Sequence, residues 1–260
     1  YKTKIRNKNN KKFNFRLIEN SILKSSKPII VAGNGIHISK SEKLFRSFLK
    51  KLKIPFISSW NASDIINTSE HLYVGRMGIF GDRASNFAIE NSDLIIVLGS
   101  RLSIPQTGYK TKNFAEKTKK IIIDIDKKEL NKNKFTKVIL KYEADLNYFL
   151  SLANKYFNNK NIKNFKEWFR LLNYWKKKYP VMQEKYTKEK KGINSFHFID
   201  CLSKNLKGNE TIVTDMGTSF TCTMQGFKIN NYKNQRLFTS SGLASMGFGL
   251  PGAIGAHFAD

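Results

Sequence analysis

A chain of 260 residues, 40% of them hydrophobic, is long enough for one large α/β domain or two smaller ones. Its two cysteines, Cys201 and Cys222, lack metal-ligand spacing and its apolar runs are too short to span a bilayer, so we expect a cytoplasmic protein without disulfides, membrane spans or a signal peptide. The net charge of +26 raises nucleic-acid binding as an alternative, but the lysines are spread along the chain without an RNA-binding aromatic motif, which favours a soluble enzyme coated with solvated lysines.

The first part of the chain alternates short apolar runs with amphipathic segments. Each apolar run predicts a buried parallel strand, and each amphipathic segment predicts a helix. The pair Ser39 and Glu42 has the spacing of a capping box, which places the start of the first predicted helix at Ser39. Strands are expected at 28–35, 54–60, 93–100, 119–126 and 137–144, and helices at 39–52, 82–92 and 144–157.

The later part of the chain changes character twice. Residues 159–191 are polar, with Trp168, Phe169, Leu172 and Trp175 at roughly helical spacing, and we interpret them as a linker that lies across a neighbouring domain. A second α/β region follows. Its pattern predicts helices at 195–206 and 245–259, the second of them rich in glycine. It also predicts strands at 210–217 and 236–241.

Strands that alternate with helices predict an α/β fold, here a doubly wound parallel sheet followed by part of a second α/β domain. A ligand of such a sheet lies beyond the carboxyl ends of the strands, here at 33–35, 99–101 and 124–126. The first residue is Tyr1 and the last residues lie within an apolar pattern, so we expect a fragment of a longer protein. The expected division is a linker at 1–20, a nucleotide-binding-like domain at 21–158, a linker at 159–191 and an incomplete domain at 192–260.

The Gly33-Asn34-Gly35 turn fails the dinucleotide-binding spacing, because Ile38 occupies the position of the third glycine. Such a turn lets the backbone approach a ligand closely, and a purely structural turn is an equal alternative. The four histidines, His37, His71, His197 and His257, have no acidic or cysteine partner at ligand spacing. We expect them on the surface or on helix faces.

Two further glycine turns follow in the second region. Asp215 and Gly217 end a predicted strand before two hydroxyl residues, a pattern that suits either a bound phosphate or a helix N-cap. Residues 241–251 are too rich in glycine for a stable helix interior, which indicates close backbone approach to a ligand. Met246 is then either a single apolar post in a cleft or a core side chain.

Taken together, these stretches resemble thiamine-diphosphate-dependent enzymes of the acetolactate synthase (large catalytic subunit) type. TSSGLASMGFGLPGAIGA at 239–256 resembles the opening of that family's C-terminal cofactor domain, and VTDMG at 213–217 resembles the strand end just before it. The stretch from 74 to 103, followed by IIIDIDKKELNK at 121–132, is similar to its central domain, which often holds FAD. The resemblance covers nearly all of residues 18–260.

The resemblance implies a parent enzyme that uses thiamine diphosphate and Mg²⁺ to decarboxylate a 2-keto acid and to transfer the acyl-anion unit to a second carbonyl. Acetolactate formation from pyruvate, in branched-chain amino acid biosynthesis, is the leading instance. Met246 is implied to prop the bent cofactor, and the Ala244 carbonyl, where glycine is usual, to accept a hydrogen bond from its 4′-amino group. The implied cofactor contacts are Met216, Gly217, Thr218, Ser219, Gly242, Ala244, Ser245 and Met246.

In the central domain the resemblance implies an FAD site, with an ADP-like ligand or an empty vestigial site as alternatives. The family's Arg-Phe-Asp-Asp-Arg is RLSIP at 101–105, which loses the second arginine, and Met77 replaces a usual histidine. The implied flavin-lining residues are Gly33, Asn34, Gly35, Gly75, Arg76, Gly99, Ser100 and Arg101, with Asp124 and Asp145 near the adenine end.

Other parts of the family pattern depart or fall outside the chain. Thr218, Ser219 and Phe220 replace Gln-His-Gln, which leaves a sister decarboxylase or lyase open, besides a non-catalytic nucleotide-binding module. The magnesium motif would begin beyond Asp260, so no metal ligand is assigned. The catalytic glutamate would precede Tyr1 and act across a subunit interface, so we expect a homodimer or tetramer and an inactive fragment.

Overall fold

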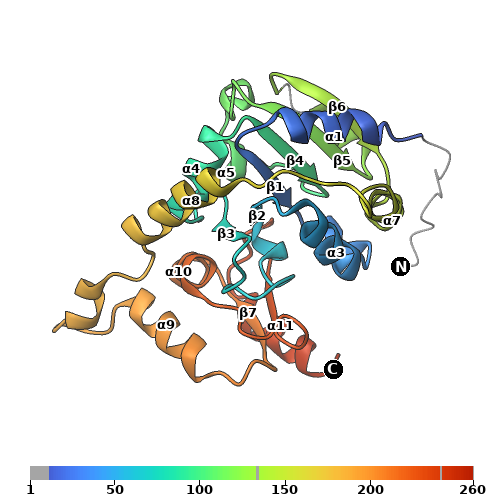
Figure 1. Ribbon diagram of the computed structural model, residues 1–260. Helices are drawn as coiled ribbons and strands as arrows, with labels where there is room; N and C mark the ends of the chain where they lie inside the picture. Colours follow the sequence, from blue (N-terminus) through green and yellow to red (C-terminus); the bar gives the residue numbers. More distant parts are fainter. Residues whose placement is uncertain (1–11, 133–134, 241, 260) are drawn as a thin grey trace.

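The computed structural model describes residues 12–132, 135–240 and 242–259, and its elements form two units (Figure 1). The central unit holds α1 to α8 and β1 to β6, and the C-terminal unit holds α9 to α11 with β7 and β8. The helices of the central unit are α1 (Phe15–Lys24), α2 (Gly35–Ile38), α3 (Glu42–Leu52), α4 (Arg83–Asn91), α5 (Ile104–Thr107), α6 (Lys127–Lys132), α7 (Leu146–Tyr156) and α8 (Lys166–Lys178). Its strands are β1 (Pro28–Ala32), β2 (Phe56–Ser58), β3 (Tyr73–Arg76), β4 (Leu94–Leu98), β5 (Lys119–Asp124) and β6 (Val138–Glu143).

The six strands of the central unit form one parallel sheet in the order β3-β2-β1-β4-β5-β6. This confirms the predicted α/β fold with a parallel sheet. The strand order reverses between β1 and β4, and in such sheets a ligand crevice lies at this reversal, outside the carboxyl ends of the strands. The predicted strands at 28–35 and 93–100 are therefore the two that flank it.

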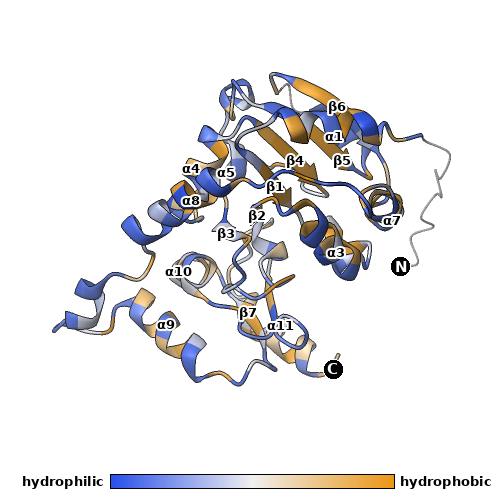
Figure 2. Cartoon of the chain, in the orientation of Figure 1, coloured by the Kyte–Doolittle hydropathy of each residue, from blue (hydrophilic) through white to orange (hydrophobic). Residues whose placement is uncertain are grey.

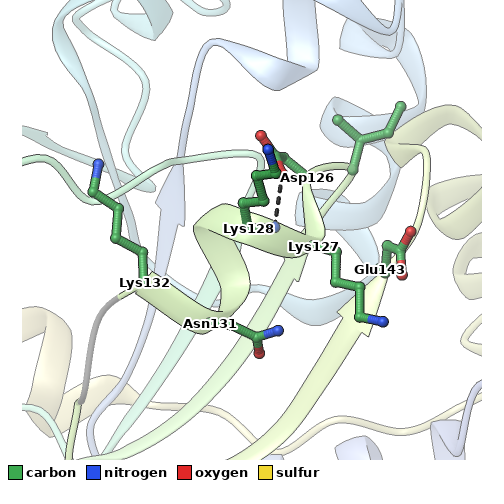
Figure 3. A pocket seen from close by; sticks show the side chains of 7 residues that line it. Asp126, Lys127, Lys128, Asn131, Lys132 and Glu143 are labelled. Carbon is green, nitrogen blue, oxygen red and sulfur yellow. Dashed lines mark hydrogen bonds between the residues drawn. The ribbon is translucent and has the colours of Figure 1, made fainter.

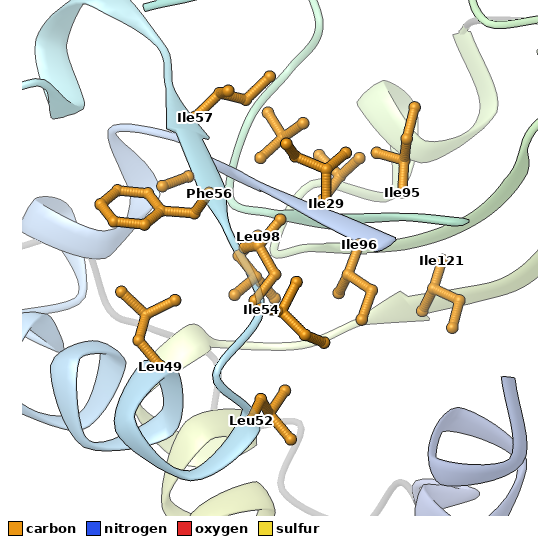
Figure 4. Close-up of a cluster of buried hydrophobic side chains, with 14 of the residues drawn as sticks. Ile29, Leu49, Leu52, Ile54, Phe56, Ile57, Ile95, Ile96, Leu98 and Ile121 are labelled. Carbon is orange, nitrogen blue, oxygen red and sulfur yellow. The ribbon is translucent and has the colours of Figure 1, made fainter. Parts of the chain in front are cut away.

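The core of the central unit is mostly aliphatic, with several buried aromatic rings, and lies on both faces of the sheet (Figures 2 and 4). All five residues of β1 and all five of β4 are buried, because helices cover both sides of these strands. Helix α3 packs against α7, and α4 against α8, on the two sides of the sheet in Figure 1. The continuous apolar runs of the sequence thus follow from burial on two faces.

The predicted capping box at Ser39 and Glu42 is wrong. Helix α3 begins at Glu42 with Ser41 as its N-cap, and no side chain caps it. The Ser39 hydroxyl instead donates to the Gly35 carbonyl at 2.7 Å, and the Glu42 carboxylate bonds to His37. The short helix α2 ends at Ile38, and residues 39–41 form the turn between α2 and α3.

Helix α8 lies inside the segment 159–191 and packs into the central unit. Trp168 and Leu172 are buried on its inner face. The Trp168 indole N–H donates to the Pro28 carbonyl at 3.0 Å, at the start of β1. The first predicted linker, 1–20, lies partly outside the described residues, and from Phe15 onward it forms helix α1.

The C-terminal unit is smaller and pairs two strands in parallel. Its core includes Phe220, Met224, Phe227 and Leu237. The central unit contributes Trp60 to the same cluster. Its elements are α9 (Ser195–Asn205), β7 (Thr211–Thr214), α10 (Thr218–Gly226), β8 (Arg236–Thr239) and α11 (Gly249–His257).

Residues 60–81 of the central unit, here called the docking segment, contact the C-terminal unit. The Thr68 backbone N–H donates to the Ile229 carbonyl at 2.9 Å, and the Ile229 N–H donates to the Thr68 hydroxyl at 2.8 Å. The rings of Trp60 and Phe80 pack on Phe220, with centroids 5.1 and 5.3 Å away. The two units therefore share one apolar contact, framed by backbone hydrogen bonds.

No helix within the described ranges 12–132, 135–240 and 242–259 is both long and apolar enough to cross a bilayer.

Candidate cofactor site

The turn after β7 and the glycine-rich loop before α11 meet at one carboxylate, that of Asp215. Its Oδ1 accepts hydrogen bonds from the backbone N–H groups of Met216, at 2.7 Å, and Gly247, at 3.0 Å. Its Oδ2 accepts from the Gly249 N–H at 2.8 Å. These hydrogen bonds from Gly249, Met216 and Gly247 lower the pKa of Asp215 below its usual value. Two segments about 30 residues apart are thus joined where the sequence placed the cofactor.

Met246 projects from this junction and does not enter the core. Its side chain is 88% exposed, and the amide of the next residue, Gly247, is the one that bonds to Asp215. The interpretation of Met246 as a core side chain is therefore wrong. The hydrogen bond of the Gly247 N–H holds the loop that carries Met246 against the turn that follows β7.

Ala244 adopts a left-handed backbone conformation, with φ of 57°. The Ala244 N–H donates to the Ser240 carbonyl at 3.1 Å, which closes a tight turn before Met246. Residues with a Cβ pay a steric cost in this conformation and glycine does not. The usual glycine at this position in the resembling family has a direct physical reason in this backbone.

Gly217 turns the chain from β7 into α10, with φ of 71°. Thr218 and Ser219 form the exposed first turn of α10, where the backbone N–H groups have no partner within the helix. The Ser219 hydroxyl donates to the Met216 carbonyl at 3.2 Å. An anion placed at this turn would meet free backbone donors and the positive end of the helix dipole.

Phe220, where the resembling family has glutamine, is buried and serves packing. It lies between Trp60 and Phe80 of the docking segment, and its side chain is 1% exposed. The departure from the family pattern thus exchanges a polar side chain for a contact between the two units.

Gly33 and Gly35 lie against Gly99 at the strand reversal between β1 and β4. The Gly35 N–H donates to the Gly99 carbonyl at 3.0 Å. A Cβ on Gly33 would stand 2.1 Å from the Gly99 oxygen, and one on Gly35 would stand 2.8 Å from the Gly99 Cα. Close packing of two backbones therefore accounts for the Gly-Asn-Gly turn, with Asn34 as the N-cap residue of α2.

Gly75 and Arg76 end β3, and Arg76 reaches the C-terminal unit. Gly75 has φ of 146°, and a Cβ there would stand 1.9 Å from an oxygen of Asp82. The guanidinium of Arg76 is buried and donates to the Phe227 carbonyl at 2.7 Å. Burial raises the pKa of Asp82, whose carboxylate accepts the Arg76 backbone N–H at 2.7 Å.

The other implied nucleotide-site residues lie at the carboxyl edge of the sheet, after β4, β5 and β6. Ser100 is buried, and Arg101 is exposed with its guanidinium 3.5 Å from Glu129. Burial raises the pKa of Asp124, which accepts the Asp126 N–H at 2.9 Å. Asp145 is the N-cap of α7, accepting from the Asn147 N–H at 2.9 Å.

An open pocket of about 820 Å³ lies at the same edge, beside α6 (Figure 3). Sequence reasoning pointed to this strand end through 124–126, but it did not single out the basic side chains of α6. Three lysines and two carboxylates give the pocket mixed charge with a basic excess. Its lining residues are Ile125, Asp126, Lys127, Lys128, Asn131, Lys132 and Glu143.

Sequence reasoning also missed the partners of His37. The expectation that this histidine has no acidic partner is wrong, because its ring nitrogens lie 2.8 Å from Glu42 and 2.7 Å from Asp64. Asp64 is 27 residues away along the chain, and no local pattern marks that contact.

Comparison with known proteins matches two family models. Residues 17–151 match the central domain of thiamine pyrophosphate enzymes, and residues 215–260 match their C-terminal TPP binding domain. The acetolactate synthase large subunit of Lactococcus lactis subsp. lactis is 34% identical over 236 residues, which cover 90% of this chain and 39% of that protein.

Other similar proteins are also named acetolactate synthase large subunits. The acetolactate synthase large subunit of Cyanidium caldarium is 30% identical over 92% of this chain and 40% of its own length. A probable acetolactate synthase large subunit of Methanococcus aeolicus is 31% identical over 92% of this chain and 41% of its own length. The chain spans about 40% of the length of the curated relatives that it matches. From its central sheet to the loop at Met246, this chain belongs to the thiamine pyrophosphate enzyme family.

Proposed function

We propose that the chain is part of a thiamine-diphosphate-dependent enzyme that decarboxylates a 2-keto acid and transfers the acyl-anion unit to a second carbonyl. The observation that carries the proposal is the joint at Asp215, which holds the turn after β7 against the loop of Met246. Acetolactate formation from pyruvate, a step towards branched-chain amino acids, is the leading instance, because the similar relatives are named acetolactate synthases.

The residues at this joint suit thiamine diphosphate. The exposed Met246 side chain is available to prop the bent cofactor, and the Ala244 carbonyl to orient its 4′-amino group. The turn from Met216 to Ser219, at the start of α10, suits the diphosphate. When bound, the cofactor supplies the electron sink for decarboxylation. Gly242 and Ser245 complete the loop.

We place the remaining parts of the active enzyme outside residues 1–260. These are the Mg²⁺ ligands and the glutamate that acts across a subunit interface, so the parent enzyme is a homodimer or tetramer. We further propose a cytoplasmic location and the domain division at 21–158 and 192–260 described above.

The test compares two exposed side chains of the parent protein. Met246→Ala is expected to lower kcat with pyruvate by about 10–100-fold, because a poorly propped cofactor is misaligned. Leu250→Ala, at a side chain that is 73% exposed on α11, is the matched control and is expected to retain kcat. Equal effects of the two variants would contradict the role of Met246. Release of carbon dioxide from pyruvate by residues 1–260 alone would contradict the placement of the missing parts.

We also propose that the central unit binds FAD or an ADP-like ligand at its carboxyl edge. The support is the basic pocket beside α6, which adjoins the strand ends that carry Asp124 and Arg101. Titration with FAD, ADP and NAD, followed by flavin fluorescence quenching or calorimetry, tests this. Lys128→Gln is expected to weaken binding, whereas Lys188→Gln, at an exposed lysine outside the pocket, is not. Equal affinity of both variants would move the ligand away from this pocket.

A further inference from the structure

Four charged side chains meet where the two units touch, and none of them belongs to the proposed cofactor site. The carboxylate of Asp64, in the docking segment, is fully buried. Its Oδ1 lies 2.7 Å from the Nε2 of His37, and its Oδ2 lies 2.7 Å from the Nε of Arg236. The other ring nitrogen of His37 lies 2.8 Å from the carboxylate of Glu42.

The geometry specifies the protonation state of the histidine. A neutral imidazole donates through one ring nitrogen only, whereas His37 has an acidic acceptor at each nitrogen. With both carboxylates ionised, both hydrogen bonds exist together only in the imidazolium form. The group then holds two carboxylates, Glu42 and Asp64, and two cations, His37 and Arg236, and its charges balance.

Asp64 also holds the backbone of the C-terminal unit. The same Oδ2 that pairs with Arg236 accepts the Leu237 backbone N–H at 3.0 Å. Both residues lie in β8, the strand that leads toward the Met246 loop. His37 in turn belongs to α2, which follows the turn at the carboxyl end of β1. The chain of contacts therefore runs from one sheet to the other.

The other side chains beside this group are an amide and a guanidinium. Helix α7 contributes the amide of Asn147, which bonds to the Ser39 and Lys40 carbonyls beside His37. Helix α3 contributes Arg46, whose guanidinium lies 4.4 Å from the centre of the Tyr232 ring. The charged groups that face His37 are thus Glu42 from α3, Asp64 from the docking segment and Arg236 from β8.

We propose that His37 is a proton-controlled latch between the two units, closed when the ring is protonated and loosened when it is not. Loss of one proton removes one of the two hydrogen bonds and leaves Asp64, a buried carboxylate, with one cation fewer. Asp64 then holds β8 less firmly, and the contact of the C-terminal unit with the docking segment weakens. The proposal does not depend on the cofactor.

The direction of the pH response follows from the environment. Burial and the charge of Arg236 lower the pKa of His37, but the hydrogen bond and charge of Asp64 and the hydrogen bond to Glu42 outweigh them, and the pKa lies above its usual value. A pKa that is raised on folding adds stability that is complete below the unfolded value of about 6.5 and is lost as the pH rises through the folded value. Burial raises the pKa of Asp64, but the hydrogen bond and charge of His37 and the charge of Arg236 outweigh burial. The pKa therefore lies below its usual value, and Asp64 stays ionised over this range.

The first test is an NMR titration of the four histidine rings of the 260-residue chain. The ring of His37 is expected to titrate above about 6.5, and its titration is expected to move to lower pH in Glu42→Gln and further in Asp64→Asn. Assignment uses the signal that disappears in His37→Gln. A His37 ring that titrates at or below 6.5 in the unmodified chain overturns the proposal, and this outcome does not require the Glu42 or Asp64 variants to fold.

The second test measures the contact itself. Trp60 lies in the shared apolar cluster, whereas Trp168 and Trp175 lie on α8 of the central unit. With fluorotryptophan incorporated, the separate 19F NMR signal of Trp60 therefore reports separation of the units during urea unfolding at pH 6 to 9. The unmodified chain is expected to lose this contact at lower urea as the pH rises, and His37→Gln to lose the pH dependence. His71→Gln is the matched control, because His71 pairs with Glu70 at 2.6 Å on the surface of the same segment. A His37→Gln profile that is parallel to the His71→Gln profile overturns the latch.

Discussion

The central and C-terminal units differ in how they bury apolar surface. In the central unit, β1 and β4 are buried along their whole length. In the C-terminal unit, α11 has no buried residue, and along β8 buried and exposed residues alternate. Leu250 and Ile254 of α11 are 73% and 51% exposed. The central unit supplies its own core, whereas the C-terminal unit depends on contacts beyond itself, which include Trp60 and Phe80.

The largest effect is expected where the two cores join. Phe220→Ala removes a ring that packs on Trp60 and Phe80, and is expected to lower the stability of the C-terminal unit by about 3–5 kcal/mol. Urea unfolding followed by tryptophan fluorescence measures this. Phe238→Ala, at a ring that is 44% exposed on β8, is the control and is expected to cost less. Equal losses would mean that the shared cluster is not what holds this unit.

A smaller effect is expected from adding a methyl group to a glycine in each unit. Gly33→Ala places a Cβ 2.1 Å from the Gly99 oxygen and is expected to destabilise the central unit by about 1–3 kcal/mol. Gly255→Ala, on α11 with open space around the new methyl group, is expected to stabilise the C-terminal unit by about 1 kcal/mol. Thermal unfolding of both variants checks the two signs. A neutral Gly33→Ala would contradict the close approach of β1 and β4.

The pH response of the central unit sharpens the comparison further. The ammonium of Lys120 is buried and donates to the Ala115, Thr118 and Thr136 carbonyls at 2.6, 2.9 and 3.2 Å. Burial lowers its pKa to about 8, against roughly 10.4 in an unfolded chain. Between these values the unfolded chain binds a proton that the folded chain does not, so stability is expected to rise with pH.

Urea midpoints between pH 8 and 10 measure this rise, and Lys120→Met is expected to abolish it. Lys119→Met, at an exposed lysine on the same strand, is the control and is expected to retain it. This slope is opposite in sign to the one expected from His37. If both variants keep the slope, Lys120 is not its source.

The smallest effect is expected at the Met246 loop. Ala244→Gly relieves a left-handed conformation at a cost in chain entropy, and a net gain below about 1 kcal/mol is expected. Ala253→Gly, in the exposed middle of α11, is expected to lose about 1 kcal/mol instead. Differential scanning calorimetry separates the two. A loss in Ala244→Gly would mean that the left-handed φ carries little strain.

The sequence predicted the features that local pattern controls. Continuous apolar runs gave β1, β4 and β5, and the glycine turns were placed at strand ends, where the structure has them. Strand β3 was missed because it is four residues long and contains Gly75. The predicted helix start at Ser39 was wrong because the Glu42 carboxylate bonds to His37 and does not cap the helix.

The rest could not be predicted because the contacts are distant in sequence. Asp64 and Arg236 are 172 residues apart, and their pairing depends on how the two units dock. The family pattern gave the positions of Asp215 and Met246, but not that the carboxylate of the first ties down the loop of the second. The cofactor residues themselves stay predictions until binding is measured.

The docking segment has a consequence for recombination between relatives. The docking segment lies within the central unit in the sequence, yet Trp60 packs in the core of the C-terminal unit. A hybrid gene that joins the central unit of one relative to the C-terminal unit of another would bring together contact residues from two different proteins. In such a hybrid, residues 60–81 should come from the same relative as the C-terminal unit, although they lie more than 100 residues before it in the sequence.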